Sequence, residues 1–214
     1  LHVRSRRQRQ MCIRDRVNAV QANTGISASA RTEVELNIAT AGSYTLALQG
    51  DNTTPQTVSF TLPNTTGADR LSAAVQAIND QSAKTGITAG LNTTGDRVIL
   101  TNASGNNIIV GDTAVVNAGS VDLTKLQADG TASGATITLT ADATANYSTV
   151  SGYLILDSQK SFSFTSGSTI LTNGSSDLKR VADLDVTTFK KATEALKTVD
   201  SSLAFISGER AKLG

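Results

Sequence analysis

The sequence has few residues that carry side-chain chemistry. In 214 residues there is no Trp, aromatic residues make up 4%, and there is one His, one Cys and one Met. His2, Met11 and Cys12 all lie in the first 16 residues, so residues 17–214 contain no imidazole and no thiol. This absence excludes Ser–His–Asp and Cys–His catalysis, and metal sites built on His or Cys, from that part of the chain.

Other site chemistry has little support. Without aromatic platforms to hold a sugar, a glycosidase-type carboxylate pair is not expected, and no Gly-Lys-Ser/Thr sequence forms a phosphate loop. Calcium binding by carboxylates stays open, although no EF-hand spacing is present. We interpret the acidic residues near Gly or Asn as turn residues that cap the backbone, namely Asp51, Asp96, Asp112, Asp122 and Asp129. We therefore expect no catalytic residue, no cofactor and no metal.

The first 16 residues differ in charge from the rest. They hold six of the 19 basic residues but only one of the 18 acidic residues, so the net charge of +1 becomes about −4 for residues 17–214. A basic arm for nucleic acid or membrane, a targeting peptide and a foreign segment are the three interpretations. No apolar run follows the arginines, no aromatic residue is present to stack on bases, and the composition changes at Val17. We interpret residues 1–16 as a non-native leader and expect no nucleic-acid partner.

No membrane insertion is expected either, because the sequence has no run of 18 apolar residues. The apolar residues instead fall into short β-type runs between polar turns. Tyr44–Leu48 and Thr57–Leu62 alternate with a period of two and flank the turn residues Gly50–Pro55. Further strands are predicted at Thr32–Ile38, Arg97–Thr101, Asn107–Val110, Ala135–Thr140, Tyr153–Leu156 and Ser161–Thr165.

A helical insertion is predicted at Ala68–Ala83. Its apolar residues recur every three to four positions, and Gly86 suits the left-handed residue after a helix. These apolar residues are Leu71, Ala74, Val75, Ile78 and Ala83.

A ten-residue element occurs twice in the chain. Val17–Ile26 aligns without gaps on Ile78–Ile87, with identical Asn, Ala, Thr, Gly and Ile residues at matching positions. Each copy predicts a helix end, a Gly cap and a strand whose first apolar residue anchors the turn. The alternative is that a common helix–Gly–strand turn recurs by chance.

Residues 183–213 are predicted to form one long helix, with Asp185 as its N-cap. Two series of apolar residues spaced by seven form a heptad seam, in which Arg210 is the one polar position. We call this set the helix-packing seam: Phe189, Ala192, Leu196, Val199, Leu203, Ile206 and Leu213.

The helix-packing seam needs a partner. Left exposed, its large apolar side chains would forgo on the order of 10 kcal/mol of burial free energy. The chain has no second heptad stretch of similar length. Either the helix folds back on the β-rich zone or its partner is missing, and the long strict period favours a missing partner.

Two regions resemble bacterial flagellins. Ala192–Gly214 is similar to the start of the C-terminal conserved helical region of that family. The repeated Ile/Val-Asn…Thr-Gly-Ile element, followed by Ala30–Leu36, resembles the flagellin hook IN motif. The resemblance covers residues 17–38, 71–110 and 183–214, whereas residues 111–180 share only the Thr/Ser-rich β character of a flagellin variable region.

This resemblance implies an α+β fold in which one or more β-rich variable outer domains carry a long C-terminal coiled-coil-type helix. Residues 17–38 would end the N-terminal core region with an IN-type element. Residues 39–180 would be the outer domain or domains, and residues 181–214 the start of the C-terminal helical core domain.

The resemblance also implies a function. The chain would be a fragment of a structural subunit of the extracellular bacterial flagellar filament, not an enzyme. Its partners would be the flagellar export apparatus and a chaperone, and other subunits through paired terminal helices. The lack of Cys in residues 17–214 suits a polymer that is exported unfolded. Because the terminal helices of the family have no counterpart here, we expect this fragment alone not to polymerise.

Two alternatives remain open from the sequence. Another flagellar axial protein, at the hook–filament junction or the cap, would share the IN element or the paired helices. A surface adhesin or carbohydrate-binding β protein would place its function in the middle zone, with the C-terminal helix as a stalk.

Overall fold

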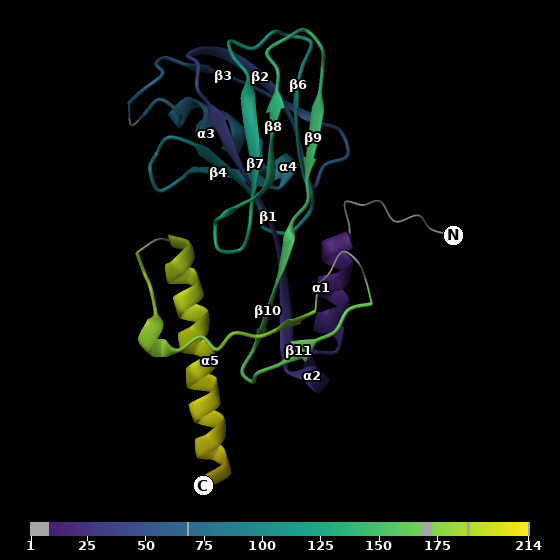
Figure 1. Ribbon diagram of the computed structural model, residues 1–214, viewed down its shortest axis with the longest axis vertical. Coiled ribbons are helices and arrows are strands. Elements are labelled where there is room, and N and C mark those ends of the chain that lie inside the picture. The colour runs from purple at the N-terminus through teal and green to yellow at the C-terminus, as the bar shows by residue number, and fades with distance from the viewer. Residues whose placement is uncertain (1–8, 68, 168–172, 188, 214) are drawn as a thin grey trace, which may run out of the picture. The chain divides into compact units, whose positions relative to one another are not determined.

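The fold is given by a computed structural model, which describes residues 9–67, 69–167, 173–187 and 189–213. The chain divides into two units that are considered separately, one centred on residues 29–155 and the other on residues 16–28 and 156–214. Its helical elements are labelled in Figure 1 where space allows. They are α1 (Arg9–Ala19), α2 (Gln21–Thr24), α3 (Ser72–Asn79), α4 (Ser82–Thr85), the 3₁₀ turn η2 (Val181–Asp183) and α5 (Phe189–Leu213).

Two antiparallel sheets form the first unit (Figure 1). The order of the larger is β4-β5-β1-β7-β8, with β10 also paired to β1, and the order of the smaller is β3-β2-β6-β9. A short pair, β11 (Ser163–Phe164) with β12 (Gly174–Ser175), belongs to the second unit. The other strands are β1 (Ile26–Ile38), β2 (Gly42–Gln49), β3 (Gln56–Leu62), β4 (Ile87–Leu91), β5 (Val98–Asn102), β6 (Ile108–Asp112), β7 (Val121–Leu126), β8 (Ala132–Leu139), β9 (Tyr147–Val150) and β10 (Tyr153–Ser158).

One apolar core lies between these two sheets and α3. In β3 every second residue is buried and the residues between them are exposed, which confirms the predicted alternation. The rings of Tyr44 and Phe60, which are register partners on β2 and β3, stack with centroids 5.6 Å apart. Burial raises the pKa of Tyr44, whose hydroxyl donates to the Thr40 carbonyl oxygen at 2.8 Å. Apart from this ring pair, the buried core residues are Val, Leu, Ile and Ala, so the core is largely aliphatic, as the composition predicts.

The predicted helix Ala68–Ala83 is two shorter helices, α3 and α4, which are separated at Asp80 and Gln81. Of its predicted apolar face, Leu71, Ala74 and Ile78 are fully buried and Val75 is partly buried in the core. Ala83 is exposed, so its place on that face was wrong. The break at residue 80 rotates α4 out of the periodicity of α3, which explains the difference.

The predicted strands are present with shifted limits. β1 begins at Ile26, six residues before the predicted Thr32, although the part paired with β5 does start at Thr32. The β7 and β9 strands were not predicted. The β9 segment is short and consists mainly of hydroxyl residues, which weakens the alternation signal, whereas the first four residues of β7 do alternate and were overlooked.

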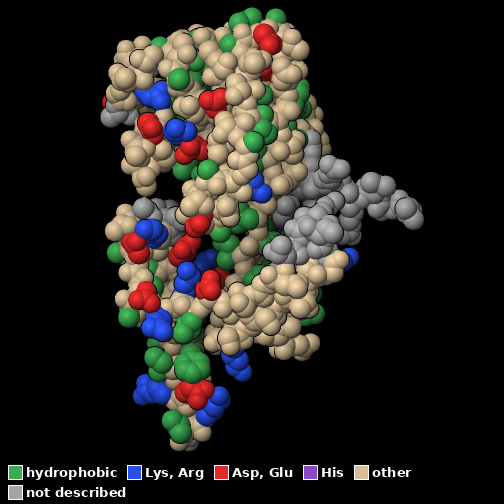
Figure 2. Space-filling view, in the orientation of Figure 1, with side chains coloured by type: hydrophobic (Ala, Val, Ile, Leu, Met, Phe, Trp, Pro, Cys, Tyr) green, Lys and Arg blue, Asp and Glu red, His purple; other side chains and the backbone are tan. Residues whose placement is uncertain are grey.

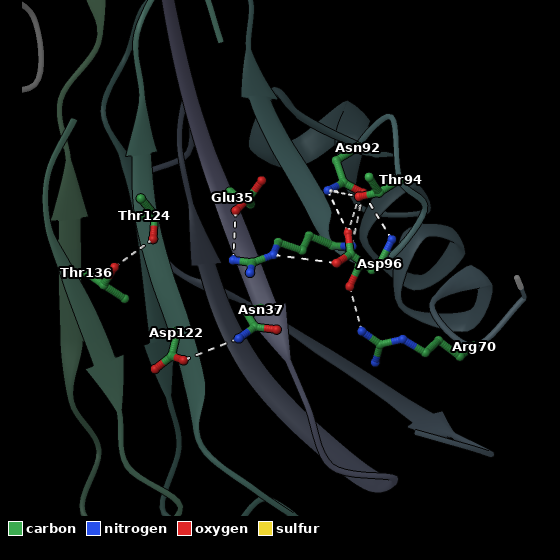
Figure 3. Close-up of polar contacts among 10 residues, drawn as sticks. Glu35, Asn37, Arg70, Asn92, Thr94, Asp96, Asp122, Thr124 and Thr136 are labelled. Carbon is green, nitrogen blue, oxygen red and sulfur yellow. Dashed lines mark hydrogen bonds and ion pairs between the residues drawn. The ribbon is translucent and has the colours of Figure 1, made fainter. Parts of the chain in front are cut away.

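A buried arginine ties the end of β1 to the turn before β5. The Arg70 guanidinium donates to the carbonyl oxygen of Ile38 at 2.7 Å and to that of Asp96 at 2.5 Å. Figure 3 shows this side chain beside the turn that Asn92, Thr94 and Asp96 form. Hydrogen bonds from Thr94 and Asn92 hold the pKa of the Asp96 carboxyl below its usual value. Arg70 therefore supplies a charged donor to two backbone acceptors, one at the end of β1 and one in the turn before β5.

We expect Arg70→Ala to lower the free energy of unfolding of the first unit by about 2–4 kcal/mol, because two carbonyl groups lose a charged donor. Arg97→Ala is the matched control, since Arg97 makes a half-exposed ion pair with Glu35 at 3.0 Å and should cost less than about 1 kcal/mol. Urea unfolding followed by circular dichroism measures both. Equal costs for the two variants would contradict this role of Arg70.

Candidate functional site

The two copies of the repeated element fold into the same hydrogen-bonded turn. In the second copy, the Asn79 side chain accepts from the Ala89 amide at 2.7 Å and donates to the Ala89 carbonyl oxygen at 3.0 Å. In the first copy, Asn18 accepts from the Ala28 amide at 2.7 Å and donates to the Ala28 carbonyl oxygen at 2.9 Å. Each asparagine therefore clamps the backbone of the residue ten positions later.

The Thr-Gly-Ile part of each copy is also the same. The Thr24 and Thr85 hydroxyls each donate to the carbonyl oxygen four residues earlier at 3.0 Å and accept the amide two residues later at 3.2 Å. Gly25 and Gly86 have φ of 69° and 67°, the left-handed conformation that glycine adopts without strain. Chance recurrence would not reproduce each of these contacts, so the alignment describes a true structural repeat.

The second copy is built into the first unit. The Asp51 amide donates to the Thr85 carbonyl oxygen at 2.8 Å. The Asp51 carboxylate accepts from the side-chain amides of Asn102 at 2.7 Å and Asn106 at 2.8 Å. The Asn102 side chain also donates to the Gly86 carbonyl oxygen at 3.2 Å. The loop after β2 is therefore fixed to the turn between α4 and β4.

The helix-packing seam is exposed along most of α5, where apolar side chains are visible in Figure 2. The side chain of Phe189 lies outside the described part of the structure, and Ala192 is half-buried. The other five residues keep 42–89% of their surface exposed: Leu196, Val199, Leu203, Ile206 and Leu213. Where the structure describes the seam, it does not bring these large side chains into a core.

A different side of α5 carries the packing within the second unit. Ala195 is buried, and Ser202 and Glu209, which follow at intervals of seven, are half-buried. The sequence interpretation missed this side because small and polar residues give no apolar periodicity. The helix thus uses a small-residue side for contact and leaves the larger apolar residues of the seam exposed.

The predicted N-cap of this helix was wrong. Asp185 lies four residues before the first residue of α5, and its carboxylate accepts from the Thr187 amide at 2.8 Å and from Lys191 Nζ at 2.6 Å. These contacts, with that of Lys191 first, hold the pKa of the Asp185 carboxyl far below its usual value. Near the end of the same helix, Glu209 and Lys212 form an exposed ion pair at 2.6 Å.

The five acidic residues considered as calcium ligands are spread over the first unit and accept hydrogen bonds. Asp96 and Asp129 lie in turns, where they accept from nearby Asn or Thr residues, as the turn interpretation predicts. Asp112 and Asp122 are in strands β6 and β7, so their placement in turns was wrong. Figure 3 shows Asp122 accepting from Asn37 at 3.5 Å.

The described ranges offer neither a metal-binding cluster nor a membrane-spanning helix. No group of three or more His, Cys, Asp or Glu residues is placed to hold a metal ion there. Among the helices of the same ranges, none combines the length and the apolar character needed to cross a membrane.

We expect Asn79→Ala to lower the free energy of unfolding by about 2 kcal/mol, because the Ala89 amide and carbonyl both lose their partner. Asn79→Asp should restore part of this, since a carboxylate can accept from the amide but cannot donate. Asn64→Ala, in the exposed loop after β3, is the matched control. Amide hydrogen exchange at Ala89 should accelerate only in the Asn79 variants; unchanged exchange would contradict the clamp.

Comparison with known proteins places these turns in a family. Residues 45–104, which include the second copy, match the model described as "Flagellin hook IN motif". The chain is 36% identical over 144 residues to the B-type flagellin of Pseudomonas aeruginosa, an alignment that covers 64% of this chain and 29% of the relative. The chain thus spans less than a third of the length of that curated relative. On these two matches the chain is similar to flagellins, over residues 45–104 and over the 144 aligned residues.

Proposed function

We propose that the polypeptide to which this chain belongs is a structural subunit of the bacterial flagellar filament, outside the cell. Its role is mechanical rather than enzymatic. The observation that carries the proposal is the helix-packing seam, whose large apolar side chains are exposed on α5 in a chain that is similar to flagellins. A seam with heptad spacing fits another helix.

The seam would be covered by a second terminal helix of the same subunit. Four of its exposed residues, Leu196, Val199, Leu203 and Ile206, extend over three turns of α5. Burial of one such side chain is worth roughly 1.5–3 kcal/mol. The contact would therefore contribute on the order of 10 kcal/mol, enough to hold a helix pair together through assembly.

The positions that flank the seam carry few charges. Small residues, Ala195 and Ser202, occupy the flanking positions on one side, where coiled coils often carry long charged side chains. Few flanking charges mean that the pairing depends on apolar burial more than on ion pairs, which surface exposure weakens. Assembly through the seam should accordingly tolerate high salt, since screening acts on charges.

The β-rich residues 39–150 would then lie outside the helical core of the filament. Their exposed strand positions are hydroxyl-rich, as at Thr57, Ser59 and Thr61 of β3. Such a surface is hydrophilic, and the apolar residues of these strands lie in the core of the unit. We propose that the complete polypeptide binds the export apparatus, a chaperone and neighbouring subunits. The basis for these partners is the similarity of the chain to flagellins.

We expect the double variant Leu196→Gln and Leu203→Gln, in the full-length gene product, to abolish or strongly reduce filament formation. Two buried leucines lost from the helix pair would cost about 3–6 kcal/mol. Phe205→Gln is the matched control, because Phe205 is an exposed apolar residue of α5 outside the seam. Electron microscopy and sedimentation after addition of polymerising salt give the readout.

The 214-residue chain alone supplies a second control. It should remain monomeric by analytical ultracentrifugation under the same salt conditions, because it contains only one heptad stretch. Filaments of normal yield from the double variant would contradict the role of the seam. A full-length product that never polymerises would contradict the filament proposal itself.

A further inference from the structure

The two copies of the IN-type turn differ in how far they are covered. In the second copy, Ile78, Thr85 and Ile87 are fully buried. Their counterparts in the first copy are Val17, Thr24 and Ile26, of which Thr24 is exposed and the other two are only half-buried. The same hydrogen bonds therefore support a closed turn in one copy and an open turn in the other.

A tight strand-ending turn covers the second copy. The Asp51 amide donates to the Thr85 carbonyl oxygen at 2.8 Å. A side chain at Gly50 would overlap that same oxygen and would reach 3.0 Å from Ile87 Cγ1. The Asp51 carboxylate packs directly against the α-carbon of Gly86, where a side chain has no room. A small residue followed by an acidic residue thus fits closely over the Thr-Gly-Ile turn.

The first copy has open space at the corresponding position. A Cβ built on Gly25 would meet no atom within 4 Å. A polar groove lies beside this turn within the second unit, and its lining includes Asn18, Gln21, Thr24, Ser27, Asp157 and Lys160. The positive φ of residue 25 requires glycine there. The free space around Gly25 is open to another segment.

We propose that this groove is the docking site for a strand-ending turn of the same polypeptide, contributed by residues that precede Val17 in the longer gene product. The second copy gives the order of segments, because β2 and its turn precede α3 in the chain and fold back on the turn that follows α4. The related flagellin is more than three times as long as the aligned segment, so family members have chain beyond these residues.

The chemistry of the docking segment follows from the second copy. A residue without a bulky side chain would lie against Thr24, and its successor would donate its amide to the Thr24 carbonyl oxygen. A carboxylate next to Gly25 would occupy the position that Asp51 takes beside Gly86. The groove would then be closed in the monomer, before any contact between subunits, and this inference does not depend on filament assembly.

Cysteine labelling tests the docking site. Thr24→Cys and Ile26→Cys are made separately in the 214-residue chain and in the full-length gene product, each in a background with Cys12→Ser where Cys12 is present. Thr65→Cys, at an exposed loop position, is the control. We expect both cysteines, one at residue 24 in the groove lining and one at residue 26 in the same turn, to react with iodoacetamide about tenfold more slowly in the monomeric full-length protein, because a docked segment must open first. The control should react equally in both proteins.

Each outcome decides the proposal. Equal rates in the two proteins at both labelled positions would overturn it. Protection that appears only after assembly would assign the groove to a neighbouring subunit and would also overturn it. Circular dichroism of each variant shows that the protein as a whole has folded. The second labelled position keeps the test valid if the substitution at the first disturbs the turn. Slow labelling in a monomer that never assembles would support the docking site even if the filament proposal failed.

Discussion

The contact between an asparagine side-chain amide and the backbone of one residue organises the polar framework of the β-rich unit. Asn79 pairs with both the amide and the carbonyl of Ala89, which is the pairing that a neighbouring strand would provide. Because β4 is the edge of its sheet, with β5 on the other side, these two groups would otherwise face solvent. The side chain ends α3, sets the starting point of β4 and protects the sheet edge at once.

The rest of the polar framework follows from this contact. With Asn79 and Ala89 joined, the chain between them must turn tightly, and Gly86 takes the left-handed conformation that makes this possible. The carbonyl groups of this turn then point to Asp51 and Asn102, which connect the loop after β2 with the end of β5. Arg70 performs a similar task for Ile38 and Asp96. Two sheets with short strands are thus joined by side-chain bonds to backbone groups.

The sequence predicted those features that depend on local periodicity. The alternation of β3, the apolar face of Leu71, Ala74 and Ile78, and the left-handed Gly86 each follow from neighbours in sequence. The asparagine clamp could not be predicted in this way, because a side chain that bonds ten residues away leaves no periodic signal. The repeat did mark Asn18 and Asn79 as a pair, but only the structure shows what the amide does. Buried Arg70 gave no signal, since arginine is ordinarily exposed.

The C-terminal helix obeys a different constraint from the β-rich unit. The strands of that unit direct their apolar residues toward one another, and hydroxyl side chains such as Thr57, Ser59 and Thr61 cover an outer face of β3. A sheet of this kind offers no apolar ridges that match residues spaced by seven. The heptad spacing of Leu196 and Leu203 instead matches the holes on the surface of another helix. The similarity of the chain to flagellins and the exposure of this seam therefore both support the proposal that α5 is one half of a helix pair.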